Sequence, residues 1–200
     1  MDLGNPLRSL LGRNAADALR VINRVDAPLV GSSIARLAGL PGSSGARALQ
    51  ALEEIGLVDA EQVGRSRRYT ANRDHLLWPA VERALEALSA LEQLIVERAN
   101  AEADVSLLLY GSVARDDADA ASDVDLLLVH DDGAEPSRID RLVDDLQQIT
   151  VRASGNSAQI YVISRGDLRR AVDDAEPIVA SLRRDARLLS GDPIDLEARA

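Results

Sequence analysis

The stretch that decides how this chain folds is Tyr110-Gly-Ser-Val-Ala-Arg-Asp-Asp-Ala-Asp-Ala-Ala-Ser-Asp-Val-Asp-Leu-Leu-Leu-Val129. A Gly-Ser pair follows one apolar run, and Asp123 and Asp125 open a second. Side chains alternate between the two faces of a strand, so both aspartates are expected on one face and Val124 on the other. Neighbouring carboxylates repel each other unless a cation lies between them, and paired oxygen donors suit Mg²⁺ that also carries phosphates.

Taken alone, Asp-Val-Asp is also typical of a polar strand start in a solvated turn. The Gly-Ser pair upstream and the apolar runs on both sides favour a binding site instead.

This combination resembles the minimal nucleotidyltransferases of the DNA polymerase β superfamily. Their signature is Gly-Ser, a spacer of about ten residues, and Asp-x-Asp. The residues that match are Gly111, Ser112, Ala114, Arg115, Ser122, Asp123 and Asp125. One departure is Asp116, where the family often has glycine. The resemblance implies a domain over residues 102–200, with a mixed sheet flanked by helices and an NTP as substrate.

The resemblance also implies roles for these residues. Asp123 and Asp125 would be the catalytic, Mg²⁺-binding residues, and Gly111, Ser112 and Arg115 would contact the nucleotide. Ser112 is also a natural N-cap for a short helix through Arg115, and the free N–H groups of such a helix start attract phosphate. Arg115 could contact a phosphate, or it could form an ion pair with Asp116 or Asp117; the sequence favours neither.

In this family a third carboxylate, on a later strand, acts as general base. The matching strand is predicted over residues 158–163 and has no Asp or Glu; Gln159 and Tyr161 share one face, but neither is a carboxylate base. Loss of a general base typically costs about 10²- to 10⁴-fold in rate. The sequence therefore leaves enzymatic activity open, with Glu176 and Asp131 as other sources of a third acid.

Hydrophobic periodicity predicts the elements around the motif. We expect a buried strand over 105–110, a helix over about 136–149, a helix over about 168–172 capped by Asp167, and a final helix over about 177–189.

The front half predicts three helices and a hairpin. The first helix spans 6–24 and ends at a turn around Asp26–Pro28. The second is capped by Ser32 or Ser33 and runs through Leu37, and the third spans about 45–55. A hairpin follows within 61–70, with Gly64 near its tip. This order resembles the winged helix-turn-helix domain of bacterial regulators, here over residues 1–76.

In that family the third helix enters the major groove of double-stranded DNA and the wing touches its backbone. The resemblance places Ser43, Ser44, Arg47 and Gln50 at the groove and Arg65, Arg67 and Arg68 at phosphates. A solvated turn at 65–68, or a winged helix used for protein–protein contact, is the alternative.

Residues 77–101 predict one long connecting helix with apolar side chains three or four positions apart. Such a helix usually packs within the protein, but it also suits a homodimer seam, which would match a two-fold DNA site.

Composition limits the function classes. There is no Cys, and no run of about 18 apolar residues or signal segment, so a cytoplasmic protein with no membrane span is the simplest expectation. Residues 1–80 carry 10 Arg and 8 acidic residues, whereas residues 81–200 carry 13 and 25. Nucleic acid should therefore prefer the front half.

Two functions remain open: a DNA-binding nucleotidyltransferase that transfers an NMP group to a hydroxyl, or a transcriptional regulator or antitoxin-like protein. The second would bind nucleotide, or a partner protein, without turnover.

Overall fold

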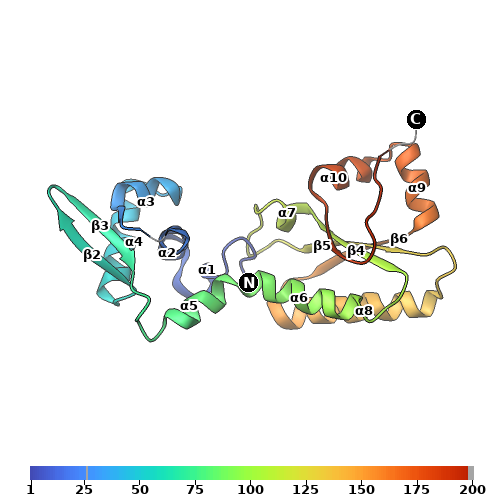
Figure 1. Cartoon of the computed structure of the whole chain (residues 1–200), viewed down its shortest axis with the longest axis horizontal. Helices are drawn as coiled ribbons and strands as arrows, with labels where there is room; N and C mark the ends of the chain where they lie inside the picture. Colours follow the sequence, from blue (N-terminus) through green and yellow to red (C-terminus); the bar gives the residue numbers. More distant parts are fainter. Residues whose placement is uncertain (26, 198–200) are drawn as a thin grey trace. The chain divides into compact units, whose positions relative to one another are not determined.

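The structure, a computed structural model, describes residues 1–25 and 27–197, which divide into two compact units. One unit runs from Gly4 to Ala87 and includes Asp2; the other begins at Leu88 and includes Met1 and Leu3. Each has its own sheet and core, so the units are described separately (Figure 1). Asp26, in the turn predicted at 26–28, lies outside the described residues.

The first unit contains helices and a small antiparallel sheet. Its elements are α1 (Arg8–Leu11), α2 (Arg13–Arg24), β1 (Leu29–Val30), α3 (Gly31–Leu37), α4 (Gly42–Glu54), β2 (Val58–Val63), β3 (Ser66–Ala71) and α5 (Trp78–Leu85). Strand β3 lies between β1 and β2. Gly64 turns the β2–β3 hairpin with a φ of 60°, so the predicted hairpin is confirmed.

Two predicted helix boundaries and one predicted cap in the first unit are wrong. The helix expected over 6–24 is two helices, because Gly12 adopts a φ of 73° between α1 and α2. Helix α4 begins at Gly42 instead of Gly45. No serine side chain caps α3, whose N-cap residue is Val30.

The second unit is built on a mixed four-stranded sheet. Its elements are α6 (Ala87–Ala99), β4 (Val105–Tyr110), α7 (Gly111–Ala114), β5 (Val124–His130), α8 (Pro136–Ser154), β6 (Ala158–Ser164), α9 (Arg165–Asp173), α10 (Pro177–Asp185) and β7 (Arg187–Ser190). The strand order is β6-β5-β4-β7, in which β5 and β6 are parallel and the other pairs antiparallel. This confirms the expected mixed sheet.

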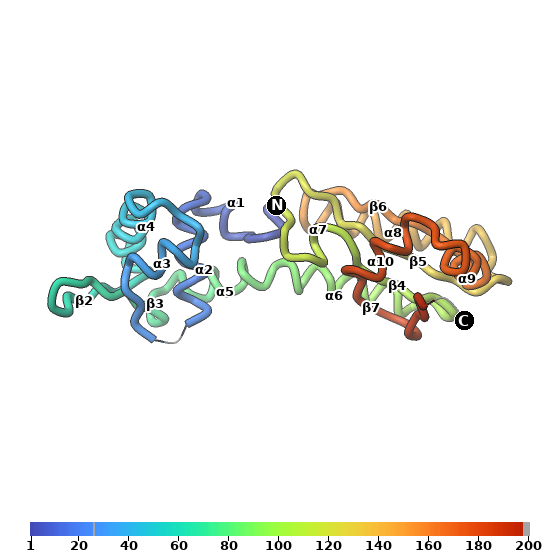
Figure 2. The backbone as a smooth tube through the Cα atoms, turned by 90° about the horizontal axis from the view of Figure 1, so that it is seen from above, coloured from blue at the N-terminus to red at the C-terminus, as the bar shows by residue number. Residues whose placement is uncertain are grey.

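Helices cover both faces of that sheet (Figures 1 and 2). Helices α6 and α8 pack on the face that carries Leu107 and Leu126. Helices α9 and α10 pack on the face that carries Leu108 and Leu127. Because both faces are covered, β4 and β5 are apolar at nearly every position, and polar side chains gather where the strands begin and end.

Residues 78–99 form two helices where the sequence predicts one. Helix α5 ends at Leu85 and α6 begins at Ala87, with Glu86 between them. Trp78 belongs to the core of the first unit, whereas Ile95 belongs to a core of the second. The apolar side chains that suggested one continuous helix therefore serve two separate cores.

Other boundaries in the second unit also differ. Helix α8 continues to Ser154 and ends at Gly155, which has a φ of 76°. The N-cap of α9 is Ser164, whose hydroxyl accepts a hydrogen bond from the Asp167 N–H, so Asp167 is not the cap. The last helix ends at Asp185 because residues 187–190 form strand β7 against β4.

Within the described ranges, no helix is both long enough and apolar enough to cross a membrane.

Candidate functional site

The two aspartates of the motif lie at the start of β5. Asp123 directly precedes the strand, Asp125 is its second residue, and both are half-buried. Val124 between them is buried in the core beneath the sheet's other face. The predicted alternation therefore places the two carboxylates on the same side, as strand geometry requires.

Gly111 brings the Gly-Ser turn against this pair. Strand β4 ends at Tyr110, which lies opposite Asp125 in the antiparallel ladder. Gly111 follows with a φ of 76°, and a Cβ there would overlap Oδ2 of Asp125 and lie 2.9 Å from its Cγ. Both the backbone conformation and the space beside Asp125 therefore favour glycine at position 111.

Ser112 lies in this turn but is not its cap. Helix α7 already begins at Gly111, its N-cap residue is Tyr110, and no side chain caps it. The predicted N-cap role of Ser112 is therefore wrong. Further along, Asp116 has a φ of 60°. This left-handed conformation favours glycine and is tolerated by Asp, which explains why either residue suits the position.

The environment of Asp125 disfavours its charge. Burial and the negative charge of Asp123 raise the pKa of Asp125, and Asp185 adds to the increase, whereas Arg115 opposes it. A cation bound between the aspartates would relieve this repulsion.

Gln159 occupies the strand position next to the aspartates. Strand β6 runs parallel to β5, and Gln159 pairs with Asp125 in the register. Its Nε2 donates a hydrogen bond of 2.7 Å to Oδ2 of Asp123. An amide therefore lies beside the two aspartates, at the strand where the resemblance led us to look for a third carboxylate. The described residues contain no group of three or more acidic or His side chains able to hold a metal ion.

Arg115 is held by two carboxylates. Its Nε donates to Asp117 at 3.1 Å and its Nη1 to Asp185 at 2.6 Å. Of the two aspartates that the sequence offered as partners, the structure selects Asp117. Asp185 was not predicted, because it lies 70 residues away in a segment that shows only a helical pattern.

Two tyrosines lie on the sheet face of Asp125. Tyr110 is its cross-strand neighbour, and Tyr161 is two residues beyond Gln159 on β6. Burial raises the pKa of Tyr110, and Asp125 and Tyr161 add to the increase. Tyr110 therefore stays protonated at neutral pH.

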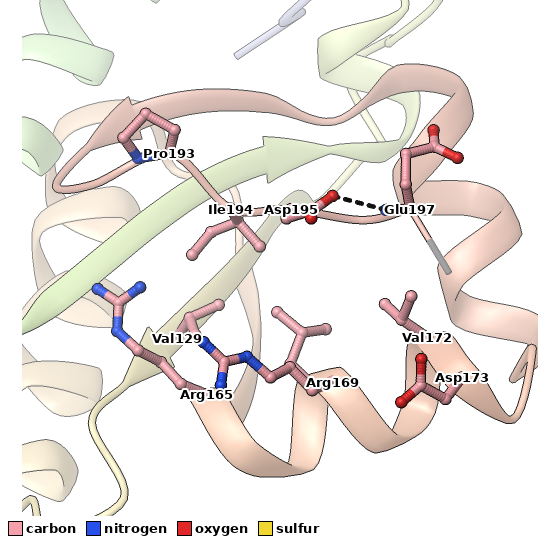
Figure 3. A pocket seen from close by; sticks show the side chains of 10 residues that line it. Val129, Arg165, Arg169, Val172, Asp173, Pro193, Ile194, Asp195 and Glu197 are labelled. Carbon is pink, nitrogen blue, oxygen red and sulfur yellow. Dashed lines mark hydrogen bonds between the residues drawn. The ribbon is translucent and has the colours of Figure 1, made fainter. Parts of the chain in front are cut away.

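A cavity of about 220 Å³ lies elsewhere on this unit, between α9 and residues 193–197 (Figure 3). Val129, at the far end of β5 from Asp125, forms part of its floor. No residue of the aspartate site lines it.

In the first unit, the residues predicted to face DNA lie on exposed surfaces. Ser43, Arg47 and Gln50 are exposed on α4, and Ser44 is half-buried. Arg65 and Arg68 are exposed at the hairpin, as is Arg67, which forms an ion pair with Glu53 and lies over the Tyr69 ring. Gln50 donates to Glu54.

Comparison with known proteins gives one family match, which lies within the second unit. Residues 88–174 match the family model described as nucleotidyltransferase domain. No curated protein sequence matches the chain. Among solved structures, the archaeal chromatin protein TrmBL2, described as showing a novel mode of DNA binding, is 16% identical over 85% of this chain and 68% of that chain. Its TM-score of 0.28 is too low for this likeness to support any conclusion.

Proposed function

We propose that the nucleotidyltransferase domain binds an NTP with Mg²⁺ at Asp123 and Asp125 and transfers the NMP group to a hydroxyl of another molecule. The close approach of Gly111 to Asp125 carries this proposal. It places the Gly-Ser turn, where a phosphate can reach the backbone, beside two carboxylates. A triphosphate in this turn lies next to a pair of metal ligands.

The residues present fit a divalent cation. Asp123 and Asp125 offer hard oxygen ligands, and their mutual repulsion remains only partly offset by Arg115. Mg²⁺ commonly takes one or two protein carboxylates and completes its shell with water and phosphate oxygens, so two carboxylates suffice. When bound, Mg²⁺ would offset the charge on the phosphate oxygens during transfer.

In the proposed reaction, the acceptor oxygen forms a bond to the α-phosphorus as the bond to pyrophosphate breaks. The hydroxyl proton passes to water, since the amide of Gln159 cannot accept it at neutral pH. Arg115 has N–H groups for a phosphate oxygen, and Tyr110 keeps its hydroxyl proton beside Asp125. Because water takes the place of a general base, turnover is expected to be slow.

The test is incubation of the full chain with Mg²⁺, each α-labelled NTP and candidate protein, RNA and small-molecule acceptors. Transfer should disappear in Asp123→Ala and Asp125→Ala and persist in Asp140→Ala, which removes an exposed acid from α8. If wild-type protein neither binds nucleotide nor transfers it, the proposed site is wrong.

A second candidate is a regulator whose domain binds nucleotide, or a partner protein, without turnover. Gln159 favours it, because its bond to Asp123 fills the position that a base would need. Nucleotide binding without transfer to any acceptor would support this candidate over the enzyme.

For the first unit we propose binding of double-stranded DNA through a winged helix-turn-helix. Four residues, 38–41, join α3 to α4, and Gly39 among them has a φ of 66°. Short turns of this kind, often with Gly, are typical of helix-turn-helix motifs. The exposed Arg65 and Arg68 suit phosphates, and the exposed Arg47 on α4 suits the groove. Affinity for duplex DNA should fall steeply with salt, and a flat salt dependence would contradict the proposal.

A further inference from the structure

Asp185 is an almost inaccessible charge at the end of α10. Its side chain is 3% exposed. Oδ2 accepts hydrogen bonds from Nη1 of Arg115 at 2.6 Å and from Nη2 of Arg184 at 3.4 Å. A buried carboxylate is costly unless its partners compensate, so its position next to the Gly111–Arg115 turn needs an explanation.

The other oxygen of Asp185 takes no part in these bonds. Oδ1 is buried and has no partner of hydrogen-bond geometry among the described residues. Burial alone raises the pKa of Asp185, but the Arg115 hydrogen bond and the Gly111 N–H outweigh burial and bring it below its ordinary value. Asp185 therefore keeps its charge, and its hydrogen bond to Arg115 ties the end of α10 to the end of the turn.

Asp185 does not complete a metal site. The described residues contain no group of three or more potential ligands, and Asp185 is already engaged by Arg115. It also lacks the exposure that a base needs to reach an acceptor. Its contacts are instead those of a residue that acts through Arg115.

Arg115 retains free N–H donors while it is hydrogen-bonded to Asp185. A guanidinium has five N–H donors, and the hydrogen bonds to Asp117 and Asp185 engage Nε, Nη1 and Nη2 once each. One N–H on each terminal nitrogen is left by these bonds, and the Arg115 side chain is 35% exposed. Asp117 and Asp185 therefore fix the direction of the Arg115 side chain and leave two of its N–H donors for a ligand.

We propose that Asp185 is a positioning residue that fixes the Gly111–Arg115 turn and directs the Arg115 guanidinium to the phosphates of the bound nucleotide. This inference rests on the proposed nucleotide site. Helix α10 would then contribute to phosphate binding indirectly, because Asp185 at its end contacts Arg115 and not the nucleotide.

The first measurement is amide hydrogen exchange of residues 111–115 in the full chain without nucleotide. Asp185→Asn keeps the size of the side chain and removes its charge. Exchange should be about 10-fold faster, as expected for loss of a charge-assisted hydrogen bond. Asp140→Asn, the same change at an exposed position, should leave exchange unchanged. Unchanged exchange in Asp185→Asn overturns the inference.

The second measurement is the affinity for each Mg²⁺–NTP by calorimetry. Asp185→Asn should weaken binding about 10-fold in the wild-type background, but less than about 2-fold in an Arg115→Ala background. Equal weakening in both backgrounds indicates a merely structural role and overturns the inference. If the wild-type protein binds no NTP, the proposed function fails, and the exchange measurement still decides whether Asp185 fixes the turn.

Arg115→Lys tests the same contact from its exposed side if Asp185→Asn does not fold. It keeps the charge and loses the planar fork, so exchange at 111–115 should increase and NTP affinity should fall. If exchange at 111–115 and NTP affinity both stay unchanged, the inference is overturned.

Discussion

Gln159 donates a 2.7 Å hydrogen bond to Asp123 from the strand position beside Asp125. A neutral donor there binds the Asp123 carboxylate without adding charge to the site. A carboxylate at this position would instead compete for the metal and accept a proton from the acceptor. Under the proposed function, this one side chain therefore decides between binding of a metal–nucleotide complex and its rapid turnover.

Gln159→Glu should accordingly raise the rate of NMP transfer by about 10- to 100-fold, part of the factor a general base usually contributes. Without metal it should lower stability, because a third carboxylate joins Asp123 and Asp125. Gln148→Glu adds the same charge at an exposed position on α8 and is the control. Steady-state transfer rates and urea unfolding with and without Mg²⁺ measure both effects, and an unchanged rate would show that the missing base does not limit turnover.

Gly111→Ala should lower stability by about 2 kcal/mol or more, because a left-handed φ already costs an L-residue about 1–2 kcal/mol and the new methyl overlaps Asp125. Nucleotide affinity should fall as well, since the methyl displaces the carboxylate. Gly133→Ala is the matched control, because a Cβ there meets open space. Retained nucleotide affinity in a folded Gly111→Ala protein would argue against the Gly-Ser turn as part of the site.

The pH dependence of stability should change in Asp185→Asn. The folded-state pKa of Asp185 lies below its ordinary value, so the charge contributes stability above the unfolded pKa of about 3.9 and loses that contribution as pH falls through the folded pKa. The wild-type protein should therefore be more stable than the variant at pH 7, by about 1–3 kcal/mol, and the difference should shrink below about pH 4. Urea unfolding from pH 7 to pH 2 measures it, with Asp140→Asn as control. A difference that does not depend on pH would mean that the charge of Asp185 is not responsible.

The parts of the site that the sequence predicts are those set by local geometry. Strand alternation places Asp123 and Asp125 together, and the short spacer returns the chain from Gly111 to the neighbouring strand. The partner of Gln159 depends on the parallel register between β5 and β6, which no local pattern encodes.

Asp185 is beyond prediction for a related reason. Whether the end of α10 is solvated or buried depends on where the helix stops, and it stops because β7 pairs with β4 across a long separation in sequence. The same limit explains the split of residues 78–99. One apolar pattern serves two cores there, and periodicity does not reveal which core each side chain enters.

Gly45→Ala should destabilise the first unit. A Cβ at Gly45 would lie 2.5 Å from Cβ of Ala35, so α3 and α4 would have to separate. Overpacking of this kind typically costs about 1–3 kcal/mol. Gly42→Ala, in the same helix with nothing within reach of its Cβ, should be neutral or slightly stabilising. Thermal unfolding and DNA titration should both report the difference, and equal behaviour of the two variants would contradict close packing of α3 and α4.

Single arginine variants of the hairpin should differ in their effect on DNA binding. Arg68 is exposed on β3, whereas Arg67 is paired with Glu53 and lies over the Tyr69 ring. Arg68→Ala should therefore reduce the slope of log affinity against log salt by about 0.9, the value for one lost phosphate contact, and Arg67→Ala by less. Glu53→Gln should strengthen binding by releasing Arg67 and removing a negative charge from α4. Fluorescence anisotropy of a labelled duplex over a range of salt concentrations gives each slope, and equal slopes for the two arginine variants would mean that the Glu53 pair does not persist in the complex.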